Sequence, residues 1–124
     1  MTRPLLEKEF VAEAAVNPYR IVKFGASDDN VLQAAAATDA LIGVVEGVAP
    51  ALGERCAVVT HGIAEIKLGG TVVRGGPITS DASGQGVAAA PAAANNNRLI
   101  GFALQSGVAG DVINVLVSPG SIQG

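Results

Sequence analysis

The sequence predicts an all-β fold, and three observations lead to this prediction. Short apolar runs recur along the whole chain, turn residues separate them, and one block of the sequence is repeated. Hydrophobic residues make up 49% of the 124 residues and charged residues 15%, a composition that argues against a disordered chain. The 16 Gly and 6 Pro interrupt the apolar residues every few positions, which favours strands and tight turns over long helices. A chain of this length suits one domain with a single core, built as a small barrel or sandwich.

Residues 1–17 differ from the rest of the chain, because their apolar side chains stand among charged ones. Leu6, Phe10 and Ala14 would share one face of a helix by their i, i+4 spacing. A short helix without a clear cap is marginal alone, and Asn17-Pro18 breaks it, so an arm that becomes ordered on a partner fits the pattern equally well. The pattern therefore predicts an N-terminal arm over residues 1–17 and a β domain over residues 18–124.

Nine short apolar runs follow this segment and are typical of strands. They are Ile21–Phe24, Val31–Ala35, Leu41–Val45, Cys56–Thr60, Ile63–Leu68, Thr71–Val73, Val87–Ala89, Leu99–Leu104 and Val112–Val117. Gly, Asp, Asn, Ser and Pro lie between the runs, as tight turns require. The Ala-rich stretch 88–94 is predicted to be a loop, because Pro91 interrupts it and Asn95-Asn96-Asn97 follows it.

One block of the sequence occurs twice, 57 or 58 residues apart. Ala40-Leu41-Ile42-Gly43-Val44 precedes Gly53-Glu54 and Val58-Val59, and Arg98-Leu99-Ile100-Gly101-Phe102 precedes Gly110-Asp111 and Val115-Leu116. The repeat predicts two similar halves that join near Gly69-Gly70. Because two copies are too few for a solenoid, we expect the halves to close on one another around a single core.

The charge and hydropathy of the chain exclude two classes of partner. The formal net charge is -3, so the chain lacks the basic surplus of a nucleic-acid-binding protein. No apolar run approaches the roughly 20 residues of a membrane-spanning helix, and we expect no membrane partner. Glu7, Lys8 and Glu9 stand where a secretory signal would have its apolar core, which predicts synthesis in the cytoplasm.

The sequence contains no catalytic or metal-binding motif. Cys56 is the only cysteine and His61 the only histidine, so an internal disulfide is impossible and a zinc site lacks its ligands. Cys56 lies inside an apolar run, which is typical of a buried, unreactive thiol. The acidic turns 28–30 and 81–84 lack the alternating pattern of a calcium loop. We therefore predict no catalytic residue, no metal and no cofactor, and a hydrolase built on Cys56, His61 and a hydroxyl ranks last.

Lys67 leaves one alternative function open. Two similar β halves with a lysine between them are also the plan of lipoyl and biotinyl carrier domains, in which the modified lysine lies at a tight hairpin tip. In residues 65–68, polar and apolar side chains alternate, so Lys67 fits the outward face of a strand better than a tip. A β-barrel carrier or small-ligand-binding domain is therefore kept as the alternative.

Several segments, taken in their order along the chain, carry a resemblance to a known family. These segments are Phe10–Ala15, Asn17–Gly25, Ala37–Val44, Gly53–Arg55, His61–Glu65, Arg98–Ala103 and Gly107–Asp111. In this order they resemble the capsid decoration, or cement, proteins of tailed bacteriophages, which are similar in plan to the head decoration protein of phage lambda. The resemblance covers nearly the whole chain and rests on structural rather than catalytic residues.

The resemblance implies a small, open β-barrel of the β-tulip type without enzymatic activity. It implies homotrimers on the outer face of the expanded phage capsid, made in the cytoplasm of a bacterial host and carried on the virion. There the protein would bind the major capsid protein, clamp neighbouring capsomers and stabilise the head against the pressure of packaged DNA. The N-terminal arm would bind the capsid through Pro4, Leu5, Leu6, Phe10 and Val11. Removal of residues 1–16 would then leave a folded domain that no longer binds capsids.

Overall fold

The computed structural model describes residues 3–90 and 96–123, with side chains at residues 6–90 and 96–121. These residues form nine strands and no helix, which confirms the all-β prediction. The strands are β1 (Arg3–Ala12), β2 (Arg20–Phe24), β3 (Asn30–Gln33), β4 (Leu41–Val45), β5 (Arg55–Lys67), β6 (Pro77–Ser80), β7 (Gly86–Ala88), β8 (Asn96–Ala103) and β9 (Val112–Gln123). All nine belong to one hydrogen-bonded sheet with the order β1-β3-β2-β4-β5-β9-β8-β6-β7.

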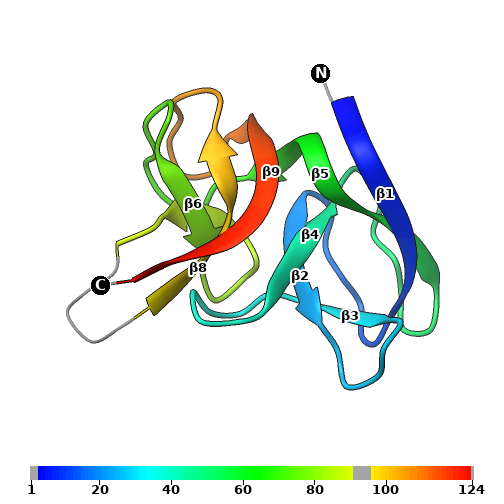
Figure 1. The fold of residues 1–124 in the computed structure, drawn as a ribbon. Helices are drawn as coiled ribbons and strands as arrows, with labels where there is room; N and C mark the ends of the chain where they lie inside the picture. The colour runs from blue at the N-terminus through cyan, green and yellow to red at the C-terminus, as the bar shows by residue number, and fades with distance from the viewer. Residues whose placement is uncertain (1–2, 91–95, 124) are drawn as a thin grey trace.

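The first five strands close into a small barrel, called here the first barrel (Figure 1). β1 pairs with β5 in antiparallel fashion from Arg3 to Val11, and with β3 in parallel fashion at Val11 and Ala12. β2 pairs with β3 on one side and with β4 on the other, and β4 meets β5 at Val44 and Val59. Because β1 contacts both β3 and β5, the sheet returns on itself and leaves no open side at the base of this barrel.

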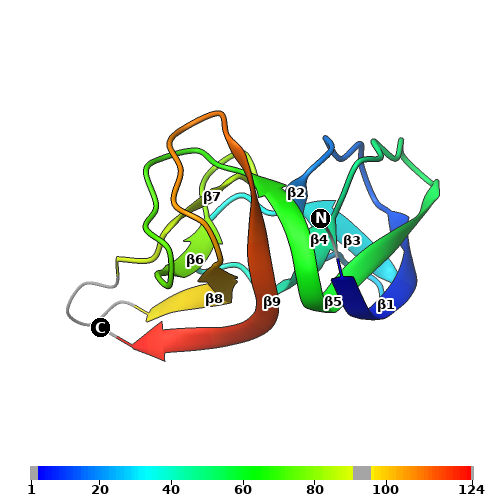
Figure 2. The same ribbon diagram turned by 90° about the horizontal axis from the view of Figure 1, so that it is seen from above.

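The second half of the chain forms an equivalent barrel, the second barrel. The C-terminal part of β5, from Gly62 to Lys67, pairs with β9, and the order continues through β8 and β6 to β7. A parallel bridge between Leu68 and Gly86, with a 2.9 Å hydrogen bond from Gly69 N–H to the Gly86 carbonyl, joins β7 to the end of β5. The two barrels lie side by side, and β5 runs from one into the other (Figure 2).

Matching backbone hydrogen bonds confirm that the two halves are repeats. The matching pairs are Ala12 N–H to Glu54 O (2.8 Å) with Leu68 N–H to Asp111 O (2.7 Å), and Gly53 N–H to Ala12 O (2.8 Å) with Gly110 N–H to Leu68 O (2.8 Å). The boundary, however, lies inside β5 rather than at the predicted Gly69-Gly70. Gly62 has a φ of 111°, a conformation that glycine tolerates, so the strand turns there without ending.

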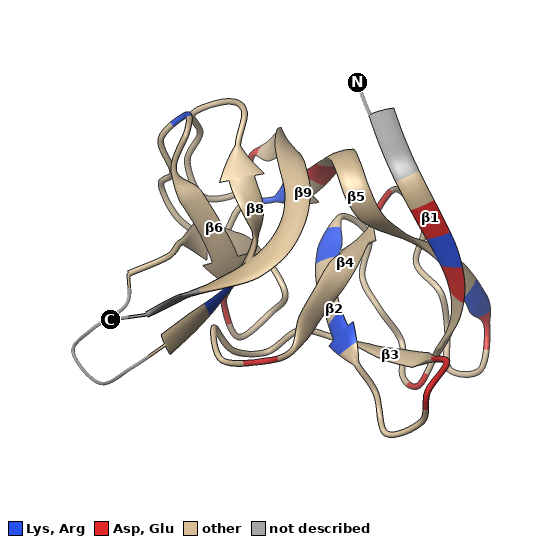
Figure 3. Ribbon diagram, viewed as in Figure 1, with Lys and Arg blue, Asp and Glu red and all other residues tan. Residues whose placement is uncertain are grey.

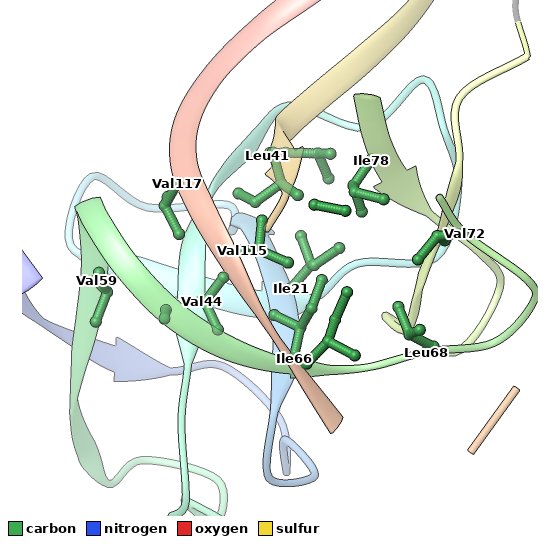
Figure 4. Close-up of a cluster of buried hydrophobic side chains, with 14 of the residues drawn as sticks. Ile21, Leu41, Val44, Val59, Ile66, Leu68, Val72, Ile78, Val115 and Val117 are labelled. Carbon is green, nitrogen blue, oxygen red and sulfur yellow. The ribbon is translucent and has the colours of Figure 1, made fainter. Parts of the chain in front are cut away.

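The prediction of a single core is wrong, because each barrel encloses its own buried cluster. The cluster of the first barrel consists of Phe10, Ala12, Val16, Val22, Val31, Val45, Cys56 and Val58. Seven of these have buried counterparts 56 to 58 residues later, namely Ile66, Leu68, Val72, Ile78, Ala103, Ile113 and Val115 (Figure 4). The same second cluster also contains residues from the outer side of the first barrel, namely Ile21, Ala34, Leu41, Val44 and Val59. Inward-facing side chains thus fill each barrel, and outward-facing ones of the first barrel join it to the second.

The N-terminal segment is part of the first barrel rather than a separate arm in its described residues. Phe10 is only 3% exposed, and Ala12 and Val16 are also buried. Phe10 is therefore buried within the chain itself rather than on a partner of an N-terminal arm, and residues 3–12 form a strand in place of the helix. The spacing of Leu6 and Phe10 fits a strand as well as a helix, because positions four residues apart share one face of either, and Ala14 lies beyond the end of β1.

The connection between β3 and β4 holds the two barrels together. The Ala37 carbonyl accepts a 2.7 Å hydrogen bond from Arg98 N–H at the start of β8. On the opposite side, Arg20 Nε and Gln33 Nε2 donate to the Ser83 carbonyl at 3.0 and 2.9 Å. The first barrel therefore covers the end of the second barrel that carries the β6–β7 turn.

The Asp39 carboxylate stabilises this connection and predicts a pH dependence. Burial raises the pKa of this carboxyl. Hydrogen bonds from the N–H groups of Ala35 (2.8 Å) and Ala36 (3.0 Å) and the Lys23 ammonium at 3.2 Å together lower the pKa by more than burial raises it, so it lies below its ordinary 3.8. A lowered folded-state pKa contributes stability above the ordinary value, and this contribution is lost as the pH falls through the folded-state value.

Asp39→Asn is expected to lower the free energy of unfolding by about 1–2 kcal/mol at pH 7. The difference from the wild-type protein should shrink as the pH falls below the ordinary value of 3.8, because the unfolded state takes up the proton first and the folded state follows at lower pH. Urea unfolding at pH 7 and at pH 3 measures both effects. An equal difference at the two pH values would show that the charge of Asp39 has no part in it.

Candidate functional surfaces

The two residues that could form a catalytic pair do not meet. Cys56 is 5% exposed and faces the interior of the first barrel. Burial raises the pKa of its thiol, and the negative charge of Glu9 adds to this effect, so the reactive thiolate is disfavoured. His61 is exposed and lies five positions further along the same strand, so the extended backbone between them keeps the two side chains apart.

A metal site and a carrier lysine find no support either. In the part of the chain that the structure describes, no group of three or more His, Cys, Asp or Glu could hold a metal ion. Lys67 pairs with Val112 at the end of β5, and its N–H donates to the Tyr19 carbonyl at 3.0 Å. This residue therefore lies on a strand, as its alternation predicts, and not at a hairpin tip.

A search of the described residues for a helix that is long and apolar enough to span a membrane finds none.

The residues predicted to bind the capsid have different environments. Leu6 is 55% exposed, Val11 is half-buried, and Phe10 lies in the core. Pro4 and Leu5 belong to β1, which pairs with β5 there, and their side chains lie outside the described residues. Of the described side chains in this set, only Leu6 is available for a large contact.

Leu6 lies at the mouth of the first barrel, defined here by the residues that line a cavity of about 550 Å³. Phe10 and Ile42 form its apolar part, and Phe24, which is 48% exposed, stands at its edge. The lining residues are Leu6, Glu7, Lys8, Phe10, Phe24, Asp28, Asp29, Ile42, Thr60 and His61. Lys8 Nζ is 3.1 Å from an Asp29 carboxylate oxygen and 4.3 Å from the centre of the Phe10 ring. The mouth is thus an apolar hollow with a mainly acidic rim.

A second exposed apolar surface lies on the second barrel. Four large side chains on the outer side of β8 and β9 define the β8–β9 face, namely Phe102, Leu104, Val112 and Leu116, each 40 or 41% exposed. Charge lies along one edge of this face, where Lys67 and Glu65 of β5 pair with Val112 and Asn114 of β9. Residues 68–124 add only Arg74, Asp81, Arg98 and Asp111 as charged residues. Figure 3 shows the contrast with β1 and its neighbours, where acidic and basic residues are dense. An exposed apolar surface with charge along one edge is typical of an interaction site.

The connections at one end of both barrels carry a third set of apolar side chains. Val48, Leu52, Val73 and Val108 are each more than half exposed, and we call them the loop face. Figure 2 shows the connections of both barrels on the same side of the molecule.

Two equivalent turns of the loop face are held by carboxylates. Glu54 accepts a 2.7 Å hydrogen bond from Ala51 N–H, and Asp111 accepts one of 3.0 Å from Val108 N–H. Both acids belong to the Gly-acid pairs of the sequence repeat. Single Val and Leu residues within turn segments are the feature of the sequence that indicates the loop face.

Comparisons with known proteins agree with this structural picture. The sequence matches the model of a family described as phage cement protein over residues 5–119. The fold is similar to that of the head fiber gp8.5 N base of bacteriophage phi29, with a TM-score of 0.68 and 17% sequence identity. That match covers 91% of this chain and 93% of the phi29 chain, and at this identity it shows a shared fold. A comparison with curated proteins finds no match. Because the family match extends over most of the chain, the protein belongs to the phage cement proteins.

Proposed function

We propose that the protein binds the outer surface of the expanded phage head as a homotrimer and stabilises it by clamping neighbouring capsomers. Its partner is the major capsid protein, and its role is structural rather than catalytic. The family match over residues 5–119 is the observation that carries this proposal. A protein that binds only the expanded shell stabilises that shell by mass action, and it opposes the pressure of packaged DNA in this way.

The loop face is the surface that we assign to the capsid. It presents Leu52 from the first barrel and Val108 from an equivalent connection of the second barrel. Two similar apolar contacts on one rigid molecule suit a shell that presents the same subunit surface many times, and linked weak contacts add to the overall affinity. This pairing of contacts supports the clamping of two capsid subunits by one copy.

The predicted N-terminal contacts are revised by the position of β1. Pro4, Leu5 and Val11 are kept as proposed additional capsid contacts. Leu6 lies at the mouth of the first barrel, where it is exposed and open to a partner, and Phe10 is excluded because it is inside this barrel. The edge of β1 that faces away from β5 pairs with β3 only at Val11 and Ala12. From Arg3 to Phe10 this edge has no partner strand among the described residues. An extended capsid segment could pair with this edge near Pro4 and Leu5.

Co-sedimentation with undecorated, expanded heads of its own phage tests the function. The wild-type protein is expected to bind until it saturates at a fixed number of copies per capsid protein. A Leu52→Asp, Val108→Asp double variant is expected to lose at least about tenfold in affinity, because it places charge in an apolar contact. Ala88→Asp, an exposed substitution on β7, is the matched control and should bind normally. Absence of binding by the folded wild-type protein would overturn the proposal.

A further inference from the structure

The two barrels have equivalent mouths, but only the mouth of the second barrel is covered. In the first barrel, Lys8, Phe24, Ile42 and Thr60 line the open cavity. Their counterparts in the second barrel, 56 to 58 residues later, are Ala64, Ser80, Ile100 and Val117, all of which are at most 2% exposed. The difference at one position is large, since Phe24 is 48% exposed and Ser80 is buried.

The cover of the second mouth is the outer side of the first barrel. Val44 on β4 and Val59 on β5 form a cross-strand pair that is buried against the second barrel, together with Leu41. Figure 4 shows these side chains beside Val115 and Val117. The Arg98–Ala37 backbone hydrogen bond fixes the contact at its edge.

The second barrel carries the same pair on its own outer side, with nothing against it among the described residues. Phe102 and Leu116 are the repeat counterparts of Val44 and Val59, and they too face each other across two paired strands. They are 41% and 40% exposed, and each is larger than its counterpart in the first barrel. Leu104 and Val112 extend this apolar area into the β8–β9 face. One chain therefore exposes one open mouth and one uncovered outer face, which are the two halves of a contact that it already makes internally.

We propose that the mouth of the first barrel binds the β8–β9 face of a second copy of this chain. Phe102 and Leu116 of one copy then pack against Leu6 and Phe24 of the next, as Val44 and Val59 pack on the second barrel within a chain. The contact joins different surfaces of the two copies, so a pair of copies still has one free mouth and one free face, and the contact repeats until a ring closes. This inference rests on the self-association in the proposed function and names its interface.

Variants of the two surfaces test this arrangement. Phe102→Asp should prevent binding by the β8–β9 face, and Phe24→Asp should prevent binding by the mouth of the first barrel. Each residue is exposed enough that the folded monomer should persist. Sedimentation equilibrium over a series of concentrations should show a wild-type oligomer and two monomeric variants. An equimolar mixture of the two variants should form a dimer and nothing larger, because only one intact face and one intact mouth remain for each pair.

Thermal unfolding of each variant verifies its fold, and Leu52→Asp on the loop face is the matched control that should remain oligomeric. A monomeric wild-type protein at all concentrations would overturn the inference, and so would a mixture that stays monomeric. The co-sedimentation experiment separates this inference from the proposed function. Failure of the wild-type protein to bind heads removes the function, whereas head binding by a monomeric wild-type protein removes only the interface.

Discussion

A chain that lacks residues 1–16 is expected to lose the cooperative folding of the first barrel. β1 pairs with β5 from Arg3 to Val11 and supplies Phe10 and Ala12 to the core, and Val16 follows it. Its removal takes away three buried side chains and also opens the barrel along both β3 and β5. Since one Phe-to-Ala change in a core already costs about 3–5 kcal/mol, the loss exceeds what a small barrel can tolerate.

Hydrogen exchange of the truncated chain measures this effect strand by strand. Amides of β2, β3 and β4 should lose protection, whereas those of β8 and β9 should retain more of it. Phe10→Ala should give a milder form of the same pattern, and Val11→Ala, at a half-buried neighbour, should have little effect. A truncated chain that unfolds as cooperatively as the full chain would show that residues 1–16 are a dispensable arm after all.

Gly101→Ala and Gly43→Ala are expected to destabilise the protein by about 3 kcal/mol each, with a loss of about 10 °C in melting temperature. A Cβ on Gly101 would overlap the carbonyl oxygen of Leu116, and a Cβ on Gly43 would overlap that of Val59. In both cases the neighbour is backbone, which cannot rotate away, so the two strands must separate.

The control is the same substitution where there is room. Gly120→Ala has no atom within 4 Å of the added Cβ and should leave the melting temperature within a few degrees. Differential scanning calorimetry of the three variants compares the effects directly. Equal stability of Gly101→Ala and Gly120→Ala would mean that β8 and β9 do not approach each other as closely as the structure shows.

Most strands could be predicted from the sequence because their apolar runs end at turn residues. The run Leu41–Val45 has the bounds of β4, and Val112–Val117 is the start of β9. Other runs were harder to interpret. Cys56–Thr60 and Ile63–Leu68 form one strand, since Gly62 bends the chain without a turn, and Thr71–Val73 contributes only a bridge from Val72 to Gly107. Local patterns report apolar character but not whether a glycine ends a strand.

The repeat could be predicted, but its consequences for the surface could not. Val44 and Phe102 stand at equivalent positions, and nothing in their local sequence shows that one is buried and the other exposed. The difference arises because Val44 lies on the side of the first barrel that packs against the second barrel, whereas no described residue covers the corresponding side of the second barrel. The prediction for the N-terminal segment was wrong for a related reason, since only the long-range pairing of this segment with β5 distinguishes a strand from an arm.

The passage of β5 from one barrel into the other also determines the mechanics of the molecule. A single strand with paired neighbours on both sides replaces the flexible linker that usually joins two modules, so the chain has no hinge between them. The fold therefore fixes the separation between Leu52 and Val108. Under the proposed capsid contacts, Leu52 and Val108 engage two subunits of the shell together only where the subunit spacing matches their own separation. The protein would then bind an expanded shell in preference to a shell whose subunits lie closer together.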